Sequence, residues 1–405
     1  MRFEFGKWII CGLMLQAIAP AATAQVSDNV VKIGVINDAA GPYADISGPG
    51  SVLAVRMAVE DFGGTVNGRP IEVVSANHQN KTDIGAGIAR EWFDTGKVDI
   101  IVDISNSAVA LAVQQLAREK NRIAIAAAVG TVDFTGKSCA PTTMSWLYDS
   151  SALASSSLGA AVKGGLDTWY FIAVDYAFGH SMQADATRVV AAAGGKVLGS
   201  VRHPLNTSDF SSYLLQAQAS GAKAVLFANG GSDLINGLKQ AKEFGLAARG
   251  QKLVTPLMFL TDVHSLGLET AQGLRFATGF YWDRNDETRQ WAQRFFARHK
   301  AMPTMVHASM YSAVRHYLAA VRDAKTDEAQ AVVAKMRATP VNDFYVKGGQ
   351  VRADGRLVHD MYLVEVKKPQ ESKAPYDYYT IVRTIPGAEA FRPAEEGGCP
   401  LAQKR

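Results

Sequence analysis

Charge of one sign is not in excess in this chain. Its 405 residues carry 42 Lys and Arg against 38 Asp and Glu, a formal net charge of +4. Charges this evenly mixed do not favour nucleic acid or an anionic membrane surface as a partner. We therefore expect no nucleic-acid partner. The length predicts roughly two domains of about 150 residues each.

The usual catalytic motifs are missing as well. Neither an HExxH zinc motif nor a P-loop occurs, and the stretch 179–183 fails the last position of a G-x-S-x-G elbow. Gly48-Pro49-Gly50 begins like a dinucleotide-binding loop, but Leu53 stands where the third glycine belongs. We expect a protein that is not an enzyme and has no cofactor and no metal. An exported hydrolase is the less favoured alternative.

Long apolar runs are absent except near the start. Residues 8–19 are apolar, but a permanent membrane-spanning helix needs about 20 such residues. A basic start over residues 1–7 precedes this run, and an A-x-A-like site at 22–24 follows it. The pattern predicts a signal peptide over residues 1–24, cleavage near Ala24 and a soluble, exported mature chain. An N-terminal membrane anchor is the alternative.

Cysteine is scarce, with three residues in the chain. Cys11 lies in the predicted signal peptide, and Ile10 stands where a lipid-attachment box would have a small residue. The remaining pair, Cys139 and Cys399, occupies loop-like surroundings. An even pair in an exported protein predicts a disulfide, here one that ties the C-terminal tail to the middle of the chain. Two separate buried thiols are the alternative.

Hydrophobic patterning predicts an α/β fold. Residues 30–36 form a continuous apolar run, typical of a strand buried on both faces in a parallel sheet. Strand and helix patterns then alternate through two halves of similar size, which predicts doubly wound parallel sheets. Further strands are expected at 71–74, 99–102, 123–127, 169–174, 197–201, 224–227 and 252–255, and helices at 51–62, 83–95, 107–120, 151–163, 180–193, 210–219 and 233–244.

The pattern changes after residue 272. A hairpin is expected across 351–366, because Asp354-Gly355 between two β-rich runs is a strong turn signal. Residues 378–382 are expected to add an edge strand. The other expected elements are a strand at 275–280 and helices at 287–299 and 308–324.

The loops after the predicted strands are where a site is expected, because open α/β sheets bind ligands at the carboxyl ends of their strands. Small, polar and aromatic residues in these loops are candidate ligand contacts. They are Tyr43, Ser105, Ser107, Ala128, Gly130, Thr131, Tyr176, Phe178 and Asp233. Each has a structural alternative: the Ser and Asp residues can cap helices, the small residues can pack against a neighbour, and the aromatics can belong to the core.

Several of these loops carry motifs of a known family. The chain resembles the Leu/Ile/Val-type substrate-binding proteins of ABC transporters, which have the type I periplasmic-binding fold. The segments that carry the resemblance, in order, are 33–35, 41–44, 134–141, 146–149, 175–179, 231–233, 273–274, 280–283, 354–356 and 399–401.

The resemblance implies two Rossmann-like lobes joined by three crossovers, with a ligand cleft between them that closes by a hinge motion. Lobe 1 would comprise 25–145 and 278–350, and lobe 2 would comprise 146–277 and 351–405. The resemblance further implies a monomer in the periplasm, with a small-molecule ligand and the membrane permease of an ABC importer as its partners.

The resemblance also implies roles for the candidate residues. From lobe 1, Ser105, Ser107 and the segment 128–131 would hold a ligand carboxylate. From lobe 2, Tyr176 or Phe178 would close on the ligand together with Asp233. The rim of the cleft would be lined by Tyr43 and Tyr281, with Trp282 beside it.

Two positions depart from the amino-acid binders of this family. Gly130 stands where those proteins have a hydroxyl, and Asp233 is shorter than the glutamate that they use for the ligand amine. The aromatics at 146–148 and the Cys139/Cys399 pair are similar to a subset with varied ligands, aromatic acids among them. The expected ligand is therefore an amino acid or another small carboxylate, including aromatic acids. A sensory module that reports its ligand to a membrane receptor is the alternative role.

Overall fold

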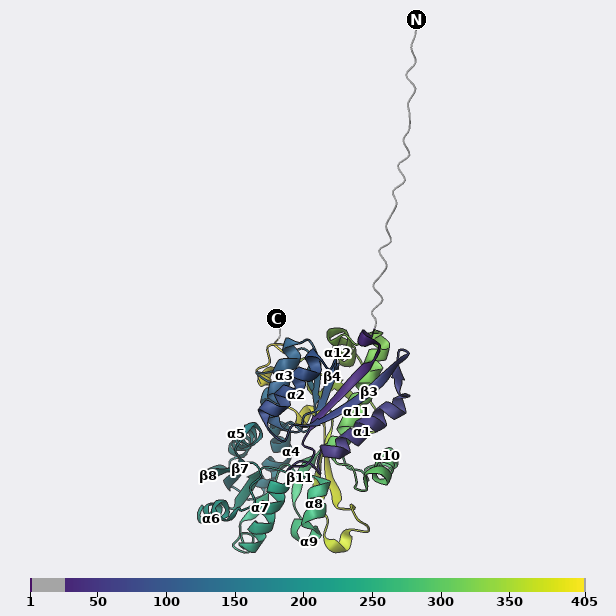
Figure 1. The fold of residues 1–405 in the computed structure, drawn as a ribbon. Helices are drawn as coiled ribbons and strands as arrows, with labels where there is room; N and C mark the ends of the chain where they lie inside the picture. The colour runs from purple at the N-terminus through teal and green to yellow at the C-terminus, as the bar shows by residue number, and fades with distance from the viewer. Residues whose placement is uncertain (2–25, 404–405) are drawn as a thin grey trace.

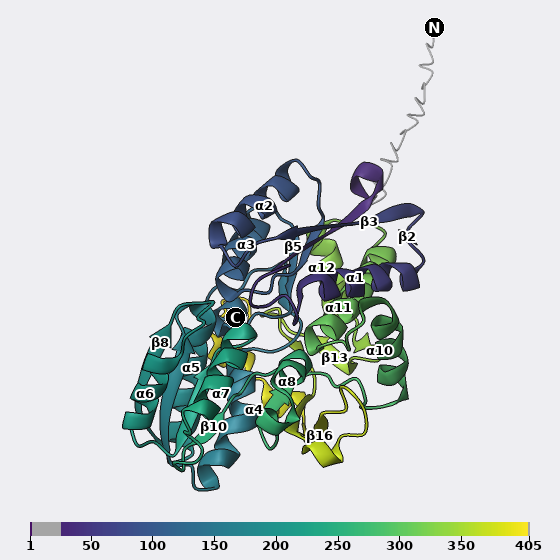
Figure 2. The ribbon, with the colours of Figure 1, turned by 60° about the horizontal axis from the view of Figure 1, so that its bottom comes forward.

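Two parallel β-sheets organise the molecule into two lobes. The computed structural model describes Met1 and residues 26–403. Cys11 and the predicted cleavage site near Ala24 lie outside the described residues. Lobe 1 is built on a six-stranded sheet of order β2-β3-β1-β4-β5-β6 and lobe 2 on a four-stranded sheet of order β10-β9-β7-β8. Figure 1 shows lobe 1 above lobe 2, and Figure 2 shows the same two bodies after a rotation.

The strands of lobe 1 are parallel except for the β2–β3 pair. The central strands are apolar and buried on both faces, as their continuous apolar runs predict. The strands are β1 (Val31–Asn37), β2 (Thr65–Val66), β3 (Arg69–Asn77), β4 (Ile100–Asp103), β5 (Ile123–Ala126) and β6 (Thr143–Ser145).

Helices from two distant parts of the chain cover the lobe 1 sheet. The helix α11, from late in the chain, packs against α1, and Figure 1 shows these green and purple segments side by side. The early helices are α1 (Gly48–Phe62), α2 (Thr82–Asp94) and α3 (Ser107–Glu119), and the late ones are α10 (Asp286–His299), α11 (Met305–Ala324) and α12 (Ala329–Ala338).

The lobe 2 sheet is entirely parallel. Its inner strand β9 is buried at every position, whereas the edge strand β8 alternates between exposed and half-buried residues along most of its length. The strands are β7 (Thr168–Val174), β8 (Lys196–His203), β9 (Ala224–Ala228) and β10 (Lys252–Val254), and the helices are α4 (Ser150–Lys163), α5 (Ala177–Ala192), α6 (Ser211–Ala219), α7 (Ser232–Glu243), α8 (Leu260–Leu266) and α9 (Leu268–Ala271).

Two small antiparallel sheets complete the fold. One has the order β11-β15-β16, from β11 (Arg275–Thr278), β15 (Met361–Val366) and β16 (Tyr379–Ile385), so the predicted edge strand is confirmed. The other has the order β12-β13-β14, from β12 (Val341–Asn342), β13 (Lys347–Val351) and β14 (Leu357–Val358).

The predicted hairpin is present but shorter than expected. Its turn contains Gly355 at φ +84°, a conformation that glycine adopts without strain. The strand β15, which was expected to be part of the hairpin, pairs instead with β11 and β16. The predicted strand at 275–280 likewise ends at Thr278, before the chain turns toward lobe 1.

The predicted disulfide joins Cys139 and Cys399, 260 residues apart. It ties the C-terminal tail to the middle of the chain, as expected. The short helix α13 (Gly387–Ala390), between β16 and the disulfide, packs against α4 of lobe 2. No helix among residues 26–403 is long and apolar enough to cross a membrane. The residue numbers at which one lobe passes into the other stay predictions.

Candidate functional site between the lobes

A small cavity lies between the two lobes. Loops after β1, β4 and β5 form its lobe 1 wall, and loops after β7, β9 and β10 form its lobe 2 wall. The lining residues are Tyr43, Ile46, Ser105, Ala128, Gly130, Tyr148, Tyr176, Phe178, Gly230, Leu257 and Phe259.

The lobes touch each other around this cavity. The hydroxyls of Tyr43 in lobe 1 and Tyr176 in lobe 2 are 2.8 Å apart and share a hydrogen bond. The Ser232 N–H of lobe 2 donates to the Pro42 carbonyl of lobe 1 at 3.2 Å. The structure therefore shows the two lobes closed on each other.

Glycine makes this close approach possible at two places. A Cβ on Gly130 would lie 2.2 Å from the ring of Phe178 across the cavity, and a Cβ on Gly231 would lie 2.2 Å from the Pro42 carbonyl oxygen. Gly230, also in the lining, has room for a methyl group, since its nearest neighbour, Leu257, would be 3.7 Å away. Gly130 thus packs tightly against lobe 2, and its contact with a ligand stays a prediction.

The lobe 1 wall is held by a buried carboxylate. Asp38 accepts hydrogen bonds from the N–H groups of Gly41 at 2.8 Å and Tyr43 at 2.9 Å, which shapes the loop after β1. The Asp38 N–H donates to Ser105 Oγ at 3.1 Å. Two post-strand loops of lobe 1 are thereby tied together, and both Tyr43 and Ser105 are held in the lining.

A second polar group lies behind the same loop. Asp103 accepts from Asn37 Nδ2 at 3.0 Å and from Ser47 Oγ at 2.7 Å. Burial raises the pKa of Asp103 to about 6, although these hydrogen bonds lower it. His307 accepts from the Thr304 N–H at Nδ1 and donates from Nε2 to the Ser47 carbonyl at 3.0 Å. Burial lowers the pKa of His307 to about 3, so its ring is neutral at neutral pH.

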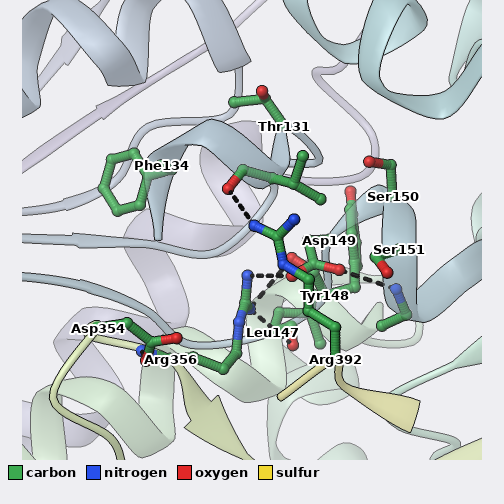
Figure 3. Close-up of polar contacts among 12 residues, drawn as sticks. Thr131, Phe134, Leu147, Tyr148, Asp149, Ser150, Ser151, Asp354, Arg356 and Arg392 are labelled. Atoms are coloured by element: carbon green, nitrogen blue, oxygen red, sulfur yellow. Dashed lines mark hydrogen bonds and ion pairs between the residues drawn. The ribbon is translucent and has the colours of Figure 1, made fainter. Parts of the chain in front are cut away.

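Tyr148 lies on the chain segment that crosses between the lobes. Asp149, the next residue, caps α4 by accepting from the Ala152 N–H at 2.8 Å and pairs with the buried Arg356 at 2.9 Å. Arg356 also donates to the carbonyls of Leu147 and Tyr148, as Figure 3 shows. This network, fully enclosed, fixes the crossing segment and with it the position of Tyr148.

A serine and a histidine are neighbours in the lobe 1 wall, but their geometry does not suit a nucleophile and its base. His78 Nε2 lies 3.4 Å from Ser105 Oγ, and His78 Nδ1 accepts the Asn80 N–H at 2.9 Å. The neutral ring therefore carries its proton on Nε2 and has no lone pair with which to accept the serine proton. Burial also lowers the pKa of His78 to about 4.

Six of the ten predicted site residues line the cavity: Tyr43, Ser105, Ala128, Gly130, Tyr176 and Phe178. Ser107 and Thr131 do not. Ser107 Oγ accepts the Thr131 N–H at 3.3 Å, and the Thr131 hydroxyl bonds to Ser181 of lobe 2 at 2.8 Å. These two residues connect loops and lobes in this structure, and their contact with a ligand stays a prediction.

Asp233 and Tyr281 also lie outside the lining. Asp233 is buried and accepts the Asn206 N–H at 3.0 Å, while burial raises its pKa to about 7. Tyr281 packs against Tyr379, with ring centroids 5.0 Å apart, in the core beside the antiparallel sheet. The ligand-binding roles of both residues stay predictions.

Five lining residues were not among the predicted site residues: Ile46, Tyr148, Gly230, Leu257 and Phe259. Leu257 and Phe259 lie in the loop after β10, the last strand of the lobe 2 sheet. This loop has the same relation to its strand as the other lining loops, so topology was the available signal. Apolar residues in it carried no chemical signal of their own.

Comparison with known proteins agrees with this architecture. A family model described as periplasmic binding protein matches residues 30–373. A periplasmic binding protein from Burkholderia mallei is 51% identical, with a TM-score of 0.91 over 93% of this chain and 100% of that one. A branched-chain amino acid ABC transporter ligand-binding protein from Burkholderia xenovorans is 42% identical, with a TM-score of 0.82 over 92% of this chain and 100% of that one.

More distant relatives are similar to this chain in sequence over part of its length, or in fold. A Leu/Ile/Val-binding protein homolog 6 from Brucella melitensis is 26% identical over 266 residues, which are 64% of this chain. That match covers 66% of the curated relative, just under two thirds of its length. An R. palustris solute-binding protein in complex with benzoate has the same fold, with a TM-score of 0.81 at 20% identity over 92% of this chain and all of that one. The two-lobed fold, the cavity between the lobes and the match over most of its length show that the chain belongs to the periplasmic binding protein family.

Proposed function

We propose that this chain is the solute receptor of an ABC importer and that it binds a small carboxylate with an aromatic or branched apolar body. The two lobes close on the ligand, and the closed form is presented to the membrane permease. The observation that carries the proposal is the cavity between two touching lobes, whose lining includes five aromatic side chains.

The cavity walls suit an apolar body. Tyr148 and Phe259 face each other with ring centroids 6.4 Å apart, and Tyr176 and Phe178 are 6.3 Å apart. No charged side chain is among the lining residues of the described chain. Burying an aromatic or branched side chain against such walls is favourable, by about 25 cal/mol for each Å² of apolar surface removed from water.

The lobe 1 wall offers donors for a carboxylate. Ser105, Ala128 and Gly130 line the cavity on this side, and Ser105 carries a hydroxyl. The N–H groups of Ala128 and Gly130 donate to no backbone acceptor within residues 26–403. Hydrogen bonds to a charged acceptor are about twice as strong as neutral ones, so such donors can hold a carboxylate without a cationic side chain.

The known relatives support this ligand class. The similar protein from Burkholderia xenovorans is described as a branched-chain amino acid ABC transporter periplasmic ligand-binding protein, and the shared fold holds benzoate in the R. palustris protein. Members of this family are solute-binding proteins, which are not enzymes, and they are exported to the periplasm. The tautomer of His78 supports the same conclusion for this chain, since it leaves Ser105 without a base.

A thermal-shift screen of the mature protein tests the proposal. The panel contains L-leucine, benzoate, 4-hydroxybenzoate and short branched carboxylates, each beside its primary amide. A ligand at 100 times its Kd stabilises the folded state by about 2.7 kcal/mol, so at least one carboxylate should raise the melting temperature while its amide does not. A panel in which no carboxylate raises the melting temperature would contradict the proposed ligand class.

A further inference from the structure

His78 lies directly behind the lobe 1 wall and is not itself part of the cavity lining. It follows β3 and is fully buried. Its backbone is fixed on both sides: the N–H donates to the Asn37 carbonyl, and its carbonyl accepts from the Lys81 N–H, both at 2.9 Å. A side chain held this firmly beside Ser105 has a defined orientation.

A local turn determines where the His78 proton lies. Gln79 and Asn80 both have positive φ, +53° and +55°, and this turn brings the Asn80 N–H onto Nδ1 of His78. Since Nδ1 accepts, the proton of the neutral ring is on Nε2, the nitrogen that faces Ser105.

The hydrogen bonds of Ser105 can then be counted. A hydroxyl has two lone pairs and one proton. One lone pair accepts the Asp38 N–H at 3.1 Å, and the other faces His78 Nε2 at 3.4 Å. With both lone pairs facing donors, the serine proton points away from Asp38 and His78, and Ser105 is a residue of the cavity lining.

We infer that His78 is a positioning residue that makes Ser105 a hydrogen-bond donor toward the ligand. The inference rests on the proposed function, because it assumes that Ser105 contacts the ligand. Its consequence is selectivity. A ligand group that only accepts hydrogen bonds, such as a carboxylate, fits opposite Ser105, whereas a group that presents an N–H there meets the serine proton.

The tautomer is measured first, because that measurement needs no ligand. Histidine ¹⁵N shifts of the labelled full mature protein, with His78 assigned by comparison with His78→Gln, report which nitrogen carries the proton. We expect protonated Nε2 and unprotonated Nδ1. The opposite tautomer would overturn the inference whether or not a ligand binds.

Selectivity is measured second, by calorimetric titration with benzoate and benzamide. The wild type should bind benzoate at least 10-fold more tightly than benzamide. His78→Leu, which keeps bulk but has no donor, should reduce that ratio to about 3-fold or less, a loss near the worth of one hydrogen bond. His78→Gln, whose side-chain amide can donate to Ser105, should restore most of the ratio.

Two kinds of result distinguish a failure of this inference from a failure of the proposed function. Equal weakening of both probes in His78→Leu, or a ratio that His78→Gln does not restore, would show a merely structural role and overturn the inference. No benzoate binding by the wild type would count against the aromatic-acid part of the proposed function, and the tautomer measurement would still decide the role of His78.

Discussion

The two walls of the cavity differ in the side chains that build them. In lobe 1, buried polar groups join the loops: Asp38 holds the loop after β1, and Ser105 and Asp103 are tied to it. In lobe 2, aromatic and aliphatic side chains dominate, among them Phe178 and Phe259. Under the proposed function, lobe 1 would orient the polar group of the ligand and lobe 2 would cover its apolar body on closing.

The largest expected effect comes from blocking the contact between the walls. Gly130→Ala places a methyl group 2.2 Å from the Phe178 ring. Because overpacking costs about 1–3 kcal/mol, we expect up to about 100-fold weaker ligand binding in calorimetry, with little change in the melting temperature of the ligand-free protein.

Gly230→Ala is the matched control for that change. Its methyl group would lie 3.7 Å from its nearest neighbour in the same cavity, so ligand binding should change only slightly. Equal weakening by the two substitutions would show that the closed contact between Gly130 and Phe178 does not limit binding.

The next largest effect tests the polar wall. Ser105→Ala removes a hydroxyl that lines the cavity. A hydrogen bond to a charged group is worth about 1.5–3 kcal/mol, so we expect carboxylate binding to weaken about 10- to 100-fold. Affinity for the matching amide should fall much less. An unchanged carboxylate affinity would remove Ser105 from the site.

A buried neutral histidine also lies behind each wall. The dependence of folding stability on pH tests whether both rings are neutral. The pKa of His307 behind lobe 1 is lowered to about 3, so below pH 6.5 the unfolded chain binds a proton that the folded protein does not. The neutral His307 therefore lowers the free energy of unfolding as the pH falls. At pH 5.5 the free energy of unfolding should be about 1.4 kcal/mol lower than at pH 7.5 because of this residue. In His307→Gln, denaturant unfolding should not show this decrease.

His203 behind lobe 2 gives the companion measurement. It accepts from Asn229 and donates to the Pro204 carbonyl, and burial lowers its pKa as well. His203→Gln should therefore also flatten the fall in stability below pH 6.5. A pH dependence that neither substitution changes would mean that these rings are not held neutral in the folded protein.

The smallest effect is expected at the hydrogen bond that joins the walls. Tyr43→Phe and Tyr176→Phe each remove the bond between the two hydroxyls, which are 2.8 Å apart. A single neutral hydrogen bond contributes about 1 kcal/mol, so each variant should bind ligand about 5-fold more weakly. The double variant should be no weaker than either single one. Additive losses would show that each hydroxyl contacts the ligand separately.

The sequence predicted the polar wall better than the apolar one, for physical reasons. Ser105 and Tyr43 follow strands and carry polar groups in loops, which is a recognisable combination. Leu257 and Phe259 have the side chains of any core residue, and only the folded position of their loop brings them to the cavity. Strands such as β1 and β9 were predictable because burial on both faces requires continuous apolar runs.

The directions of the Tyr281 and Asp233 side chains depend on contacts between distant segments of the chain. The ring of Tyr281 packs with Tyr379 beside the antiparallel sheet, whose order depends on strands about 90 residues apart, and its expected place at the cleft rim stays a prediction. Asp233 follows β9 as expected, yet its carboxylate accepts from Asn206 and does not line the cavity. The start of a helix can be read from sequence, but the direction of the side chain there depends on tertiary packing.

The central claim is that lobe 1 binds the carboxylate of the ligand and lobe 2 covers its apolar body. A crystal structure of the mature protein with its best-binding carboxylate tests this claim most directly. The account predicts the ligand between closed lobes, with its carboxylate within hydrogen-bond distance of Ser105 Oγ and the Gly130 N–H and its apolar body against Phe178 and Phe259. A ligand outside this cavity, or one whose carboxylate points to the lobe 2 aromatics, would contradict it.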